Sequence, residues 1–213
     1  MDGVRHQCMI YEGSPAIHLQ GVASVIREKL KENWRCLYLN SPTMVAGMRS
    51  YLAAAGLNVS AEVSNGALVL SSDDGHLIAG RFDVDRMIDM LSDAIDGASG
   101  DGYAGLWAAG DMTWEFGSEK NFTKLMEYEY RLEGLFQKHP ELQGICQYHA
   151  DTLPVDALET ALYTHRAYYI NATLSQMNPY YTEPGFTKRA KIPTGQWKQM
   201  LASGHDRPSQ NDR

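Results

Sequence analysis

The sequence predicts an α/β fold in three layers, with helices on both faces of a mostly parallel sheet. Short apolar segments alternate with amphipathic segments of about 10–17 residues, which is the pattern of strand–helix–strand units. The 213 residues, 44% hydrophobic and 21% charged, suffice for one core without disulfide bonds. We therefore expect one domain over residues 1–185, followed by a basic, partly disordered tail over residues 186–213.

The first half of the chain predicts two strand–helix pairs. Apolar runs at residues 8–11 and 36–39 predict buried strands. Apolar residues spaced three or four apart predict a helix over residues 17–31, and a second helix over 44–55 ends at Gly56. Residues 57–63 and 67–70 are strand candidates on either side of Asn65-Gly66, a dipeptide typical of hairpins.

The second half continues the alternation. Helices are predicted over residues 82–95, 121–138 and 154–163, the last with a proline at its start. Strands are predicted over residues 103–109, 144–148 and 168–174, and a glycine-rich loop over 98–102. This order places a strand between successive helices, as a parallel sheet requires.

The composition excludes several classes of protein. With 19 basic and 26 acidic residues, the net charge of −7 argues against a general nucleic-acid binder and a polybasic membrane anchor. No apolar run approaches the roughly 18 residues of a membrane span, and the first residues lack a signal-peptide pattern. Cys8, Cys36 and Cys146 form no CxxC pair, so we expect a reducing cytoplasm rather than a disulfide framework.

The segment after the first strand lacks the residues of a phosphate-binding loop. Such a loop reads GxxxxGK[ST], because its amides and lysine hold phosphates and its hydroxyl holds magnesium. Counting from Gly13, the last three positions are His18, Leu19 and Gln20. HExxH and GxSxG are also missing from the sequence, so hydrolase activities have no local support. We expect no enzymatic activity, no catalytic residues, no cofactor and no metal.

Seven short segments in order resemble the MEDS domain, a methanogen/methylotroph, DcmR-type sensory domain. They span roughly residues 5–185 and read HQCMIYEG, WRCLYLNSP, GRFDVDRMIDML, GYAGLWAAGDMTWEF, EYEYRLEG, GICQYHADTLP and THRAYYINATLSQMNPYY. The resemblance implies a RecA/KaiC-like fold whose phosphate loop is degenerate. It also implies a sensor of a small molecule, such as a hydrocarbon derivative or a methylated compound, acting in signal transduction or transcription regulation.

The resemblance further implies that a histidine and a cysteine of the first segment contact the ligand. The matching residues are His6 and Cys8. The chain departs from the family where Trp107 and Asp111 replace an arginine and a glutamate, and where His165-Arg166 replaces His-Pro. The missing arginine argues against transferring a contact to a charged ligand.

The residues themselves suggest where such a site would form. His6 and Cys8 share one face of a strand, and Cys146 and Tyr148 repeat that arrangement before His149. If the strand ends meet at the carboxyl edge of the sheet, His6, Cys8, Cys146 and His149 converge there. Alternatively, the cysteines are buried small apolar residues, and their spacing alone does not support a zinc site.

Further candidates come from the strand exits and one helix. Tyr11 and Trp114 are expected to line an apolar pocket, or else to fill the core. Asp111 ends a strand, where it is either a relic of a metal-binding acid or a helix cap. Glu129 lies in the resembling segment EYEYRLEG and is included among the ligand-binding candidates.

We therefore expect a non-catalytic sensor that binds a small molecule at the carboxyl edge of the sheet. Its output would pass through a regulatory protein partner or a homo-oligomer, without a membrane or direct nucleic-acid contact. Two alternatives stay open: a nucleotide-binding protein or ATPase with a degenerate phosphate loop, and a scaffold subunit of a regulatory assembly.

Overall fold

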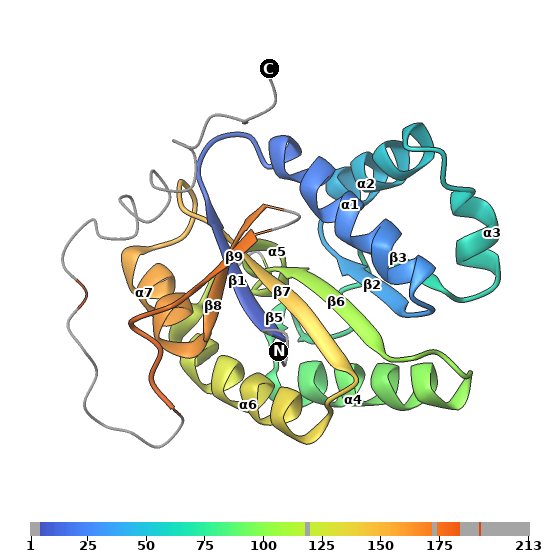
Figure 1. The fold of residues 1–213 in the computed structure, drawn as a ribbon. Coiled ribbons are helices and arrows are strands. Elements are labelled where there is room, and N and C mark those ends of the chain that lie inside the picture. The colour runs from blue at the N-terminus through green and yellow to red at the C-terminus, as the bar shows by residue number, and fades with distance from the viewer. Residues whose placement is uncertain (1–4, 118–119, 172–173, 184–191, 193–213) are drawn as a thin grey trace.

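The computed structural model describes residues 5–117, 120–171, 174–183 and 192, and a seven-stranded sheet lies at its centre (Figure 1). The strand order is β3-β2-β6-β7-β1-β8-β9. Neighbouring strands are parallel except for β8 and β9. The strands are β1 (His6–Tyr11), β2 (Arg35–Leu39), β3 (Leu68–Ser71), β6 (Leu106–Asp111), β7 (Leu142–His149), β8 (Ala167–Asn171) and β9 (Leu174–Met177).

Helices cover both faces of this sheet, which confirms the predicted α/β class (Figure 1). One face carries α1 (Ala16–Lys31), α2 (Pro42–Ala54) and α3 (Val59–Ser64). The other carries α4 (Val84–Gly100), α6 (Leu125–Lys138) and α7 (Val155–Thr164). Two apolar clusters fill the layers between sheet and helices. Because successive strand residues point to opposite faces, Cys8 and Ile10 join the α6 side, whereas Met9 and Tyr11 join the α1 side.

The predicted hairpin around Asn65-Gly66 is wrong. Residues 59–64 form α3, and the dipeptide connects this helix to β3, which lies parallel to β2. The side chain of Asn58 accepts a hydrogen bond from the Ala61 amide and so caps the helix. Of the two predicted strands, residues 57–63 contain a short capped helix and residues 67–70 contain one strand. Hydrophobic periodicity over about six residues does not distinguish a helix from a strand.

Other elements differ from the predictions at their ends. α4 continues to Gly100 through the predicted glycine-rich loop, because Ala98 is buried and extends the apolar face of the helix. A hairpin of β4 (Leu77–Ile78) and β5 (Arg81–Phe82) and the short helix α5 (Met112–Glu115) were not predicted, and the predicted helix over 121–138 begins as the separate short helix η1 (Phe122–Lys124). Each is shorter than the window in which hydrophobic periodicity can be recognised.

The predicted tail, residues 186–213, lies outside the described residues except for Ile192, which is buried in the cluster on the α6 side. Cys36 is fully buried on the other side and is a core residue, as expected. Among the described residues, no helix is both long and apolar enough to span a membrane.

Close packing at the centre of the sheet yields a first prediction, for Gly144 of β7. A Cβ atom there would lie 2.6 Å from the carbonyl oxygen of Ala108 in β6 and 3.4 Å from the Phe136 ring. Gly144→Ala is therefore expected to lower the free energy of unfolding by about 1–3 kcal/mol in urea denaturation. Gly134 of α6, where a Cβ meets nothing within 4 Å, is the matched control. Gly134→Ala is expected to raise stability by up to about 1 kcal/mol, and equal effects of the two substitutions would contradict the packing argument.

Candidate functional site

The nine predicted site residues separate into one group between the sheet and α6 and a second group at the carboxyl ends of the strands. His6, Cys8, Cys146 and Tyr148 face α6, and Glu129 reaches them from that helix. The remaining four residues lie at or beyond the carboxyl ends of the strands: Tyr11, Asp111, Trp114 and His149. Asp111 and His149 both contact Tyr11 on the α1 side, whereas Trp114 packs against the apolar cluster on the α6 side, so the nine residues do not form one site.

On the α6 face, four side chains with metal-ligating atoms meet: His6, Glu129, Cys146 and His165. Their exposed fractions are 3%, 0%, 6% and 0%. His6 Nε2 lies 3.6 Å from both Cys146 Sγ and Glu129 Oε2, and His165 Nε2 lies 3.5 Å from Glu129 Oε2. One potential ligand atom from each residue lies within 4.8 Å of all the others. We call these four residues the inner cluster.

Hydrogen bonds around the inner cluster fix its orientation. His6 Nδ1 donates to Glu133 Oε2 over 3.0 Å, and His165 Nδ1 donates to the carbonyl of Ala161 over 2.8 Å. The Tyr148 hydroxyl donates to Glu129 Oε1. These bonds leave Glu129 Oε2 and His165 Nε2 buried without a hydrogen-bond partner.

Burial dominates the electrostatics of the inner cluster. It raises the pKa of Glu129 to about 7, against the opposing charge of His6 and the Tyr148 hydrogen bond. It raises the pKa of the Cys146 thiol and lowers the pKa of His165. A charged form of any of these groups therefore needs a compensating charge inside the protein.

The predicted convergence of His6, Cys8, Cys146 and His149 at the carboxyl edge is wrong. His6 begins β1 and lies at the opposite end of that strand from the carboxyl edge. The Cys8 thiol points to the carbonyl of Ala167, at 3.9 Å. His149 ends β7, where its Nε2 donates to the carbonyl of Gly13 over 2.8 Å. The strand alternation placed three of these side chains on one face correctly, but not their positions along the strands.

At the carboxyl edge, Asp111 has a structural role. Its side chain caps α5 by accepting from the Trp114 amide over 2.9 Å, and it accepts from the Tyr11 hydroxyl over 3.2 Å. Tyr11 stacks on His149 with ring centroids 4.9 Å apart. The capping interpretation of Asp111 is thereby confirmed. Trp114 lies in α5 with its ring 5.0 Å from that of His76.

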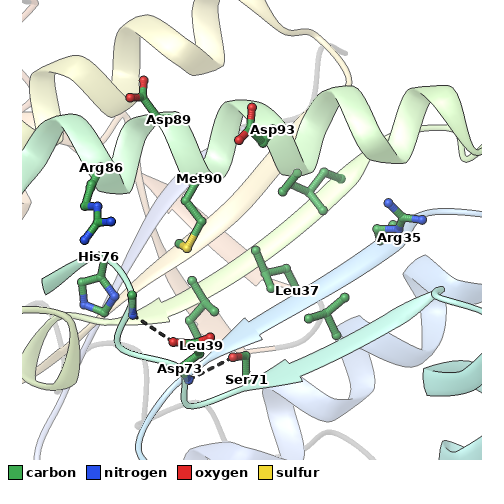
Figure 2. A pocket seen from close by; sticks show the side chains of 14 residues that line it. Arg35, Leu37, Leu39, Ser71, Asp73, His76, Arg86, Asp89, Met90 and Asp93 are labelled. Atoms are coloured by element: carbon green, nitrogen blue, oxygen red, sulfur yellow. Dashed lines mark hydrogen bonds between the residues drawn. The ribbon is translucent and has the colours of Figure 1, made fainter.

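A groove lies on the α6 face of the sheet, away from the inner cluster, between α4 and the edge formed by β2 and β3 (Figure 2). We call it the α4 groove; its volume is about 690 Å³. Leu37 and Leu39 form part of its floor and Met90 reaches into it from α4, with His76 and Arg86 at one end and Arg35 at the other (Figure 2). Apolar side chains with a few polar groups are typical of small-molecule sites.

Comparison with known protein families shows which family the chain belongs to. The sequence profile described as MEthanogen/methylotroph, DcmR Sensory domain matches residues 5–166. The chain belongs to the MEDS family. The matched range contains the inner cluster and the residues that line the α4 groove. No curated protein matches the chain in a sequence search.

Sequence reasoning missed two parts of this MEDS domain. It treated His165 only as a departure from a family pattern, although the side chain completes the inner cluster. The four cluster residues belong to separate elements, so no spacing rule connects them. It also missed the α4 groove, because its floor residues read as ordinary core positions of β2. The signal that points to the inner cluster is the burial of His6 and His165, because buried polar side chains require partners.

Asp111 gives a second prediction. Asp111→Ala removes the helix cap and the acceptor of the Tyr11 hydroxyl, and should lower the free energy of unfolding by about 1–3 kcal/mol. Asp111→Asn keeps an acceptor and should cost less than about 1 kcal/mol, because burial already raises the pKa of this carboxyl group and disfavours its charged form. Urea denaturation at neutral pH measures both. If Asn were as destabilising as Ala, a charged carboxylate rather than a cap would be required at this position.

Proposed function

We propose that this MEDS domain is a non-catalytic sensor that binds a small, largely apolar molecule in the α4 groove. The observation that carries the proposal is the groove itself, whose volume of about 690 Å³ falls within the range of small-molecule sites. Its apolar residues are Leu37, Leu39, Val69, Met90, Ala94 and Leu106. A hydrocarbon derivative gains affinity from burial against such a floor, at about 25 cal/mol per Å² of apolar surface.

The polar groups of the groove favour a ligand with one polar or cationic end. Asp73, Asp89 and Asp93 line it together with Arg86, and Arg35 already binds Asp101. Methylated amines and halogenated alkanes combine an apolar body with a single polar or polarisable group. These compounds therefore suit the groove better than a polyanion.

Binding in the groove would act on two neighbouring elements. Its walls are α4 and the loop after β3, where the Asp73 amide donates to Ser71 and the Gly75 amide donates to Asp73 (Figure 2). A ligand that prefers one position of this loop or of α4 shifts the population toward it. A regulatory partner or a second copy of the chain that contacts these elements would read the change as a signal.

The alternative of a nucleotide-binding protein finds less support. The Gly13 amide, at the position of a phosphate-binding loop, donates to the Asp151 carboxylate over 2.7 Å. A carboxylate beside this loop repels phosphate, and the lysine of the motif is absent. Titration with ATP and magnesium is expected to leave the melting temperature unchanged; a rise that Asp111→Ala abolishes would favour this alternative.

A third prediction tests the α4 groove directly. Differential scanning fluorimetry with methylated amines, methylated thiols and halogenated alkanes is expected to show at least one stabilising compound. A saturating compound raises stability by about 2.7 kcal/mol at a hundredfold excess over its Kd. Val69→Trp fills the groove and should abolish this shift.

Val63→Trp is the matched control for this experiment. Val63 is similarly exposed, at 38% against 37% for Val69, but lies on α3 and does not line the groove. The control should retain the full shift. A shift that survives Val69→Trp would place the ligand elsewhere, and no shift with any compound would favour the scaffold alternative.

A further inference from the structure

We infer that the inner cluster of His6, Glu129, Cys146 and His165 binds one zinc ion inside the domain. Two imidazoles, one thiol and one carboxylate make a donor set that zinc accepts in tetrahedral sites. All four side chains are buried, so the site is closed rather than open to substrate. The inference is independent of the α4 groove, because the four residues do not line it.

The distances within the cluster match a tetrahedral site. With zinc–nitrogen and zinc–oxygen bonds of about 2.0–2.1 Å and a zinc–sulfur bond of about 2.3 Å, neighbouring ligand atoms lie about 3.3–3.6 Å apart. Three measured separations, 3.6, 3.6 and 3.5 Å, fall at or near this range. The other pairs are within 4.8 Å, so that small side-chain rotations complete the tetrahedron.

Hydrogen bonds already orient both imidazoles for metal binding. Because His6 Nδ1 donates to Glu133 and His165 Nδ1 donates to the Ala161 carbonyl, each ring directs the lone pair of Nε2 into the cluster. Carboxylate and carbonyl acceptors behind ligating histidines are the usual outer shell of zinc sites. The Tyr148 hydroxyl supports Glu129 in the same way, by binding Oε1 and leaving Oε2 directed toward the two histidines.

A cation explains what the protein groups leave unsatisfied. Glu129 Oε2 and His165 Nε2 face each other at 3.5 Å, and neither has a hydrogen-bond partner. Two acceptors in this position repel one another, and buried polar atoms without partners are rare in native proteins. A divalent cation satisfies both atoms and balances a Glu129 carboxylate and a Cys146 thiolate.

The position of the ion predicts a structural role. His6 and Cys146 come from the paired strands β1 and β7, Glu129 from α6, and His165 from the residue after α7. One ion would therefore join the centre of the sheet to two helices of the covering layer. Binding energy of this kind contributes directly to folding.

The fourth prediction tests metal content and ligand type on the full chain. Purified protein from zinc-supplemented medium is expected to contain about one zinc per chain by elemental analysis. X-ray absorption at the zinc edge should show one sulfur at about 2.3 Å and three nitrogen or oxygen ligands at about 2.0–2.1 Å. This measurement uses the wild-type chain and so does not depend on a variant that folds. Substoichiometric zinc, or a ligand shell without sulfur, overturns the inference.

A pair of cysteine variants identifies the sulfur. Cobalt substituted for zinc should give the visible bands of a tetrahedral ion and a near-ultraviolet thiolate-to-cobalt band. Cys146→Ala is expected to lose the thiolate band, whereas Cys8→Ala, on the neighbouring strand at the same register, should keep it. Loss of the band in Cys8→Ala alone, or its persistence in Cys146→Ala, rejects the assigned ligand set. The groove ligand is tested separately, by the thermal shift of the Val69→Trp variant, so a failure of the zinc site can be told apart from a failure of the proposed function.

Discussion

The buried carboxylate of Glu129 is the constraint around which the α6 side of the domain is built. It lies fully buried under the central strands, where an unpartnered charge would cost several kcal/mol. The structure meets this cost by placing a tyrosine hydroxyl and two histidines around it. Those partners come from β1, β7 and the residue after α7, so the carboxylate can be accommodated only when the sheet and both helices are assembled.

Small residues on the strands follow from the same constraint. Glu129 and its partners need space between α6 and the sheet, and the strand residues that face them are cysteines at positions 8 and 146 and a glycine at 144. Larger side chains would fill the layer and displace the helix. The cysteines therefore do more than act as small apolar residues: one packs against the Ala167 carbonyl, while the other lies within 3.6 Å of His6.

Patterns with local causes could be predicted from the sequence, and contacts between distant segments could not. Strand alternation placed His6, Cys8 and Cys146 on one face, and the proline and glycine signals placed most helix ends within a few residues.

The predicted hairpin at Asn65-Gly66 was wrong because Asn58 caps the segment before this dipeptide as a helix. The inner cluster was missed because Glu129 and His165 meet only through the packing of α6 and α7 on the sheet. The α4 groove depends on how far α4 stands from β2, which no local pattern encodes.

The place of α4 connects the two sites that we propose. α4 forms one wall of the α4 groove and also packs against α6, where Arg131 binds Asp85 over 2.5 Å. A small cavity of about 30 Å³ between these helices and the sheet is bordered by Leu39 of the groove and by Cys146 of the inner cluster. Movement of α4 therefore changes the packing next to both sites. If a groove ligand and the metal ion favour the same position of α4, the metal strengthens ligand binding. The ligand must then strengthen metal binding by the same factor, because coupling between two sites is reciprocal.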